Sequence, residues 1–142
     1  MEPLDLSKKP PRSPWVKIGG AYMLARTIDK LRGSLPGGHP GPYKIVPGFS
    51  ERLLQIIGCS EDEIRDVVAR AKSEDEVVNW VAARIDKEKL ERYNDRASKR
   101  SIGDVDDLED FIKRYPVAKG LPRETSIFDL LDKDDASMYS HA

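Results

Sequence analysis

The chain has 142 residues, of which 39% are apolar and 35% are charged, a composition typical of a globular domain and not of a disordered or membrane-embedded chain. The net charge of −1 does not by itself call for a nucleic-acid or membrane partner. No apolar run approaches the roughly twenty residues of a membrane helix, and the first residues do not have the pattern of a secretory signal. We expect a single helical domain over residues 1–142, located in the cytoplasm.

Residues 1–18 are predicted to form an extended arm. Pro10, Pro11 and Pro14 fix φ and bias the residues before them away from a helix. The spacing of Pro11 and Pro14 also fits the PxxP pattern of polyproline ligands. The favoured interpretation is that apolar side chains hold the arm on the domain's own core; these are Leu4, Leu6, Trp15 and Val16.

A first helix is predicted from about Gly20 to Leu35. Its apolar side chains recur at helical spacing, at Leu24, Ile28, Leu31 and Leu35. The opposite half carries the charged side chains Arg26, Asp29, Lys30 and Arg32.

Residues 33–48 are predicted to form a long loop, because this segment holds five of the ten glycines and four of the ten prolines. Loops of this length in a compact domain are often functional or mobile. The segment, which includes His39 and Tyr43, is therefore either a lid over a ligand or a plain connector.

A short helix is predicted over residues 50–57, and a repeated tetrapeptide then marks two further helix starts. Ser60-Glu61-Asp62-Glu63 recurs as Ser73-Glu74-Asp75-Glu76. Each repeat fits a capping box, in which the serine hydroxyl accepts from an amide of the first turn and the second glutamate reaches back.

A strongly charged helix is predicted from Asp86 to Arg100, with a basic stripe formed by Lys89, Arg92, Arg96, Lys99 and Arg100. Such a stripe can follow the phosphates of a nucleic acid. Carboxylates are interleaved along the same helix and the stripe contains no aromatic side chain for stacking. We therefore favour a solvated face and regard nucleic acid as the least supported partner.

The C-terminal part is predicted to contain a helix over residues 104–115, ended by Pro116, and a short amphipathic turn over residues 127–131. Residues 133–142 are expected to be a frayed tail. The fold class is therefore all-α: a small orthogonal bundle of five to seven short helices with an extended proline-rich N-terminal arm.

The sequence contains none of the catalytic motifs that we looked for. It has no Gly-x-Ser-x-Gly elbow, no phosphate-binding Walker loop and no His-Glu-x-x-His pair. One cysteine, Cys59, and two histidines cannot form a Cys/His zinc set. No metal or cofactor is expected, and whether the chain catalyses a reaction stays open.

Three motifs carry a resemblance to a known family. They are Asp5-Leu6-Ser7-Lys8 followed by Pro10-Pro11-Arg12-Ser13-Pro14, then Ile18-Gly19-Gly20, then Arg26-x-Ile28-Asp29-Lys30-x-Arg32. With these motifs the chain resembles, across nearly its whole length, a bacterial family of unknown function (domain-of-unknown-function family fifty sixty-nine). The resemblance implies no activity, but it directs attention to the arm and the first helix.

The favoured function is a non-catalytic binding or regulatory module with a protein partner. The alternative is a protein or enzyme that binds a small molecule or an anion, phosphate or carboxylate, between the arm, the first helix and the 33–48 loop. Guanidinium groups suit such ligands. The candidate ligand-binding residues are Arg12, Arg26, Asp29, Lys30, His39 and Tyr43. In a simpler interpretation, Asp29 only holds Arg12 of the arm in place.

Overall fold

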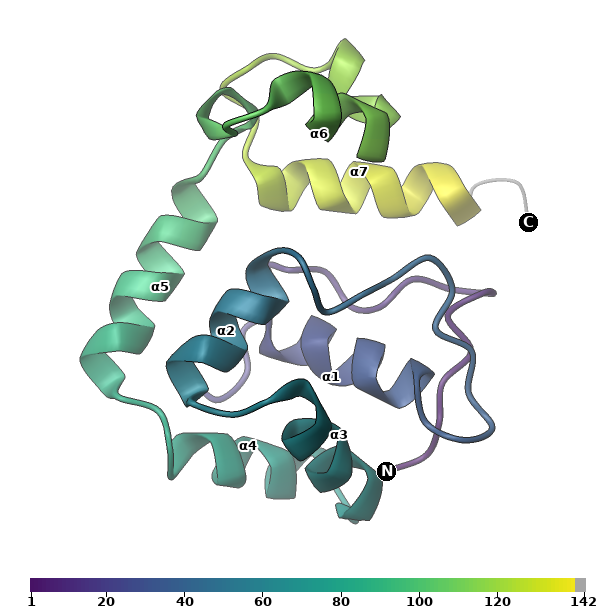
Figure 1. Cartoon of the computed structure of the whole chain (residues 1–142), viewed down its shortest axis with the longest axis vertical. Helices are drawn as coiled ribbons and strands as arrows, with labels where there is room; N and C mark the ends of the chain where they lie inside the picture. Colours follow the sequence, from purple (N-terminus) through teal and green to yellow (C-terminus); the bar gives the residue numbers. More distant parts are fainter. Residues whose placement is uncertain (140–142) are drawn as a thin grey trace.

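The computed structural model describes residues 1–139 and confirms the expected all-α bundle (Figure 1). Within these residues the backbone forms isolated bridges but no sheet. The α-helices are α1 (Leu24–Gly33), α2 (Phe49–Ile57), α3 (Glu61–Arg70), α4 (Glu74–Ala82), α5 (Lys87–Lys99), α6 (Leu108–Arg114) and α7 (Ile127–Tyr139). Two 3-10 turns, η1 (Ile102–Asp104) and η2 (Pro116–Gly120), flank α6.

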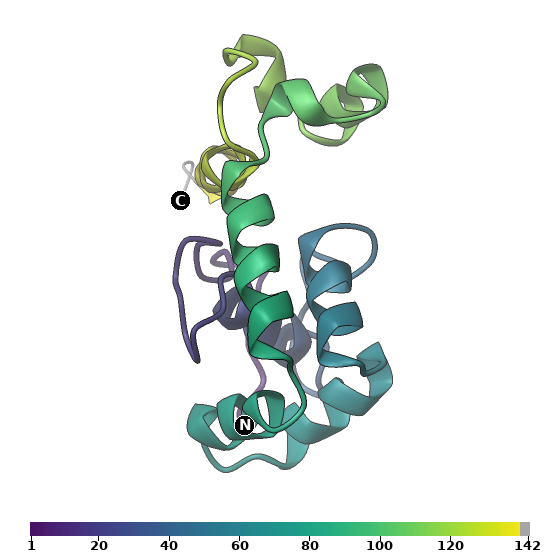
Figure 2. The same cartoon turned by 90° about the vertical axis from the view of Figure 1, so that its left-hand side faces the viewer.

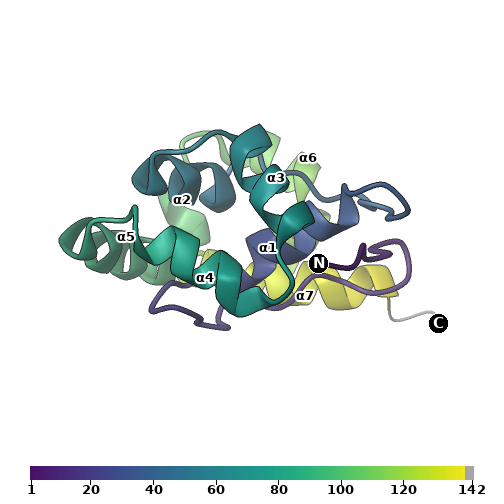
Figure 3. The same ribbon diagram turned by 90° about the horizontal axis from the view of Figure 1, so that it is seen from below.

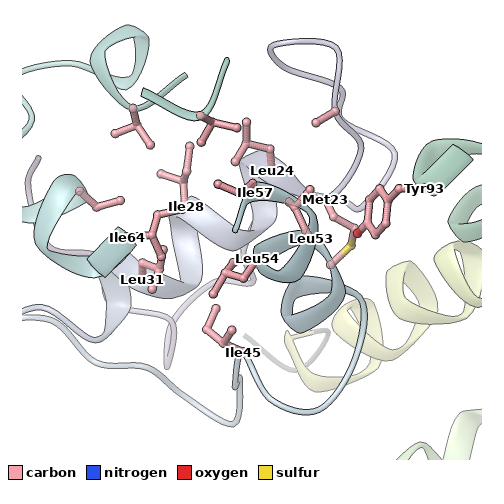
Figure 4. Close-up of a cluster of buried hydrophobic side chains, with 14 of the residues drawn as sticks. Met23, Leu24, Ile28, Leu31, Ile45, Leu53, Leu54, Ile57, Ile64 and Tyr93 are labelled. Carbon is pink, nitrogen blue, oxygen red and sulfur yellow. The ribbon is translucent and has the colours of Figure 1, made fainter. Parts of the chain in front are cut away.

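The helix α5 runs along one side of the molecule and joins its two ends (Figures 1 and 2). The helices α3 and α4 lie at one end, and α6 lies at the other, above α7 (Figures 1 and 2). Seen from below, α3 and α4 lie in front (Figure 3). The main core gathers apolar side chains from α1, α2, α3 and α5 and from the segments beside them, including Met23, Leu24, Ile28, Leu31, Ile45, Leu53, Leu54, Ile57, Ile64 and Tyr93 (Figure 4). A smaller apolar cluster packs α6 and η2 on α7.

The arm lies on α1 and on the loop that follows it. Leu6 is fully buried, and its backbone N–H donates to the His39 carbonyl at 2.8 Å. Pro11 and Pro14 are buried as well, so neither proline is open to a polyproline-binding partner. Trp15 is 37% exposed, but its ring packs edge-on against Phe128, with centroids 4.9 Å apart. Leu6 and Trp15 therefore hold the arm to the domain as expected, whereas Val16, also expected to do so, is 36% exposed.

The first helix is shorter than the predicted span from Gly20 to Leu35. Gly19, Gly20 and Met23 have φ values of 56°, 76° and 70°, which lie in the left-handed region and cannot continue a right-handed helix. A turn closed between Ile18 and Ala21 therefore precedes α1. The helix begins only at Leu24 and ends at Gly33.

The two repeated tetrapeptides differ in the structure. Ser60 forms the predicted capping box: its hydroxyl accepts from the Glu63 N–H at 3.1 Å, and Glu63 accepts from the Ser60 N–H at 3.0 Å. The prediction for Ser73 is wrong, because its side chain makes no capping bond. The backbone of Ser73 is more extended, with φ −148° against −84° at Ser60, and Glu76 accepts from the Lys72 N–H instead.

The C-terminal elements differ most from expectation. The helix predicted from 104 begins at Leu108, where the Asp107 side chain accepts from the Asp110 N–H at 3.0 Å. The segment from 133, expected to be frayed, instead continues α7 to Tyr139. The hydroxyl of Tyr139 donates to the Leu6 carbonyl, so a tertiary contact holds this turn. Residues 140–142 of the expected tail lie outside the described residues. No helix in the described part of the chain is both long and apolar enough to cross a membrane.

Candidate functional site

Arg26 is the centre of a polar cluster between α1, α7 and the long loop. Its side chain is 3% exposed, and its guanidinium forms a bidentate ion pair with Asp135, at 2.7 Å from Nη1 to Oδ2 and 3.1 Å from Nη2 to Oδ1. The Tyr43 hydroxyl donates to the same carboxylate at 2.8 Å, and the Tyr43 ring centre lies 5.4 Å from the guanidinium. Arg26 also donates to the Arg12 carbonyl at 3.2 Å. The cluster therefore joins the arm, the loop and α7 to α1.

Arg12 of the arm is paired with two carboxylates. It donates to Asp29 through Nε and Nη2, both at 3.1 Å, and its backbone N–H donates to the same side chain at 2.8 Å. It also donates to both carboxylate oxygens of Glu74 at the start of α4. The hydrogen bonds to Glu74 and Asp29 raise the pKa of Arg12 despite its partial burial. These contacts support the simpler interpretation of Asp29 as a residue that holds the arm.

Lys30 has a different environment from the two arginines. Its Nζ donates to the Lys44 carbonyl at 3.1 Å and to the Ser50 hydroxyl at 3.3 Å, and it forms no ion pair within residues 1–139. Burial, followed by the charge of Arg26, lowers the pKa of Lys30 to about 7. The Ser50 hydroxyl is also bonded to Thr27 at 2.8 Å. Ser50 is 1% exposed, so this lysine–serine contact is closed to a substrate.

The six predicted residues do not all meet at one place. Arg26, Lys30 and Tyr43 lie around the cluster with Asp135, and Arg12 joins them through its carbonyl and its bonds to Asp29. His39 stands apart: its Nδ1 accepts from the Gly41 N–H at 3.0 Å, and its backbone pairs with Leu4 and Leu6 of the arm. A hollow of about 530 Å³ beside the arm includes only Arg12 and Asp29 of the six. Their role as ligand-binding residues stays a prediction.

Asp135 and Glu74 complete these contacts and were not predicted. Asp135 follows Phe128 and Leu131 at helical spacing, so it lies on the apolar face of α7. An acidic residue on the apolar face of a helix indicates a buried partner. Asp135 was not considered because it falls within residues 133–142, which were expected to be a frayed tail. Glu74 was assigned only to a helix start, and nothing near it in sequence indicates Arg12.

A second polar surface lies between α2 and α5, which run side by side (Figures 1 and 2). The Tyr93 hydroxyl of α5 donates to the Phe49 carbonyl of α2 at 2.9 Å and ties the two helices together. Beside this contact lies a groove of about 800 Å³, called here the α2–α5 groove. Its lining includes the apolar or aromatic residues Phe49, Ile56, Tyr93 and Ala97.

The charged side chains around this groove are predominantly basic. The cations are Arg52 of α2 and, along and just after α5, Lys89, Arg92, Arg96, Lys99 and Arg100. The acidic residues of the lining are Glu51 and Asp104. Lys99 is paired with Asp95 at 2.6 Å on its own helix. In the described part of the chain the other five cations form no ion pair. A pronounced excess of positive charge therefore faces solvent here.

The basic stripe itself was visible in the sequence, but the groove was not. Helical spacing places Lys89, Arg92, Arg96 and Lys99 along one side of α5 over about 15 Å. The contribution of Arg52 depends on α2 lying beside α5, and no local pattern predicts that pairing.

The described residues give little support for a metal site or a reactive thiol. No group of three or more histidine, cysteine, aspartate or glutamate side chains among residues 1–139 is arranged to hold a metal ion. Cys59 is half-buried, and burial raises the pKa of its thiol, which lowers its reactivity.

Comparison with known proteins identifies the family of this chain. A search of curated proteins finds no match. The sequence model of one family, described as Domain of unknown function (DUF5069), matches residues 8–137. This match covers both polar surfaces and every α-helix except the last two residues of α7. The resemblance inferred from the arm and first-helix motifs is thus confirmed, and the chain belongs to the DUF5069 family.

Proposed function

We propose that the protein is a non-catalytic binding module whose α2–α5 groove binds an anionic partner. The observation that carries this proposal is the set of five groove cations that form no ion pair with any described residue and are arranged around a partly apolar floor. Guanidinium groups bind carboxylates and phosphates through paired hydrogen bonds, and those of Arg52, Arg92 and Arg96 are exposed and available.

The lining of the groove supports binding more than catalysis. The lining residues include no histidine, cysteine or serine, so a general base or a nucleophile is not evident there. Tyr93 is the one tyrosine of the lining; burial raises its pKa and its hydroxyl already donates to Phe49. The cytoplasm remains the expected compartment, which suits a module with a free thiol and no disulfide.

The site predicted around Arg12, Arg26, Asp29, Lys30, His39 and Tyr43 is a second candidate for binding a small anion. The hollow beside the arm favours it. Against it, an anion at Arg12 must compete with Asp29 and Glu74, and Arg26 is buried against Asp135. Within residues 1–139, Arg52, Arg92 and Arg96 of the groove form no ion pair that an anion must displace, so we rank the groove first.

Retention on a heparin column tests the groove with a defined polyanion. At about 10 mM salt, exposed charges act over about 30 Å, and we expect the wild-type protein to be retained and then released as salt rises. The double variant Arg92→Glu/Arg96→Glu should pass through. The control Lys119→Glu/Arg123→Glu makes the same charge change at exposed positions outside the groove and should be retained. Flow-through of the wild type, or equal loss in both variants, would contradict the proposal.

A further inference from the structure

We infer that the partner of the α2–α5 groove is an acidic amphipathic helix of another protein, an inference that rests on the function proposed above. The groove combines two features that such a helix needs. Its floor offers apolar surface at Phe49 and Ile56, both partly exposed. Its rims carry cations, with Arg52 on α2 and the basic stripe on α5. An amphipathic helix presents an apolar stripe to such a floor and charged side chains to the rims.

The spacing of the cations on α5 matches a helical partner. Lys89, Arg92, Arg96 and Lys99 recur at intervals of three and four residues. A second helix lying along α5 has the same rise and periodicity, so a carboxylate at every third or fourth position meets each cation in turn. An extended peptide repeats its side chains on one face about every 6.6 Å and loses this register over about 15 Å.

Nucleic acid fits the groove less well, because both aromatic rings of the floor are already in contact with other parts of the fold. Tyr93 is 6% exposed and its hydroxyl is bonded to Phe49. The Phe49 ring packs edge-on against Phe128, with centroids 5.3 Å apart. Binding of single strands relies on open aromatic faces. Glu51 and Asp104, also in the lining, repel phosphates, whereas a protein helix can meet them with a lysine or arginine.

A small set of labelled probes separates these partners. The test probe is a fluorescein-labelled peptide of about 14 residues, or about 21 Å of helix, with leucine at helical spacing and glutamate at most other positions. A peptide of the same composition in scrambled order keeps the charge and removes the apolar stripe. A single-stranded DNA oligonucleotide of equal charge represents nucleic acid. Fluorescence anisotropy at low salt gives Kd for each probe with the whole protein.

We expect the amphipathic peptide to bind at least about tenfold more tightly than the scrambled peptide and the oligonucleotide, a difference of about 1.4 kcal/mol. Arg52→Glu and Arg92→Glu should each weaken its binding, because the two rims act together. The control Arg123→Glu should not. Circular dichroism should also show a gain of helix when the peptide binds.

Two outcomes overturn the inference and leave the proposed function standing. Equal affinity for the two peptides shows that only charge is recognised. Tighter binding of the oligonucleotide, again lost in Arg92→Glu, identifies nucleic acid as the partner. If no probe binds at low salt, or if the groove variants bind all probes as wild type does, the proposed function fails together with the inference.

Discussion

Arginine side chains have opposite environments in the arm–α1–α7 cluster and in the α2–α5 groove. Arg12 and Arg26 are bound to Asp29, Glu74 and Asp135, which lie on other segments of the chain. Arg52, Arg92 and Arg96 of the groove are exposed and form no ion pair with the other residues that the structure describes. The difference teaches that the role of an arginine depends on where the folded chain places its carboxylates.

The arm–α1–α7 cluster and the α2–α5 groove should also respond differently to mutation. A buried ion pair adds little stability over a well-packed apolar pair, but removal of one partner leaves an uncompensated charge. An exposed cation stays hydrated whether or not it is paired, so its loss costs little. Mutations in the cluster should therefore lower the free energy of unfolding, and mutations in the groove should weaken binding.

The largest expected effect is that of Asp135→Ala. The change leaves the buried Arg26 guanidinium without its counter-ion and the Tyr43 hydroxyl without its acceptor. We expect the free energy of unfolding to fall by about 3–5 kcal/mol, measured by urea denaturation. Asp134→Ala is the matched control: Asp134 is partly buried, forms no ion pair within residues 1–139, and has its pKa raised by burial. Equal losses in the two variants would show that the ion pair is not the cause.

A double replacement separates the charge from the packing at the same place. In Arg26→Met/Asp135→Leu both charges are removed, and apolar side chains fill most of the space. We expect this variant to regain most of the stability lost in Asp135→Ala, because no unpaired charge remains. A loss as large as that of the single variant would show that the hydrogen bonds of Tyr43 and the arm carry the stability.

Arg12→Ala should have a smaller effect. Its side chain is 36% exposed, so solvent screens part of its attraction to Asp29 and Glu74. We expect a loss of about 1–2 kcal/mol, because Asp29 is buried and loses its charged donor. Lys9→Ala, which changes an exposed neighbour beside the same hollow, should stay within about 0.5 kcal/mol of wild type in the same urea titration. A neutral Arg12→Ala would mean that the arm is held by its apolar contacts alone.

Lys30 gives the cluster a dependence on pH. The folded-state pKa of about 7 lies below the usual 10.5, so between these values the unfolded chain binds more protons than the folded one. Stability contributed at this site therefore rises with pH from about 7 to 10.5. The partial exposure of Lys30 limits the effect to about 1 kcal/mol. The slope, measured by urea denaturation across this range, should disappear in Lys30→Met and persist in Lys44→Met, which replaces an exposed lysine. An unchanged slope in Lys30→Met would place its origin elsewhere.

The sequence predicted those parts of the fold that depend on local patterns. Leu24, Ile28 and Leu31 repeat at helical spacing and are all buried in α1. The start of that helix was missed because left-handed φ values at Gly20 and Met23 are not evident in the pattern. Ser60 and Ser73 have the same local sequence, yet only Ser60 caps its helix. At Ser73 the backbone φ is −148° instead of −84°, and Glu76 accepts from the Lys72 N–H.

The candidate sites were harder to predict because their contacts span the chain. Arg26 and Asp135 are 109 positions apart, so the charge on α1 appeared free for a ligand. The sequence therefore singled out Arg26 as a candidate ligand-binding residue without indicating that Asp135 already pairs with it. For the groove, the basic stripe on α5 was predicted from helical spacing. The apolar floor and the position of Arg52 could not be predicted, because they depend on the packing of α2 against α5.

The smallest effect on stability is expected at the groove. Arg92 and Arg96 stand one helical turn apart on α5, where like charges repel by a few tenths of a kcal/mol. The neutral variant Arg92→Gln/Arg96→Gln should therefore unfold within about 0.5 kcal/mol of wild type in urea, or be slightly more stable, while its retention on heparin falls. Stability kept while binding is lost assigns the two side chains to recognition. A loss of more than about 1 kcal/mol would instead give these arginines a structural role like that of Arg12, and the contrast between the two surfaces would no longer hold.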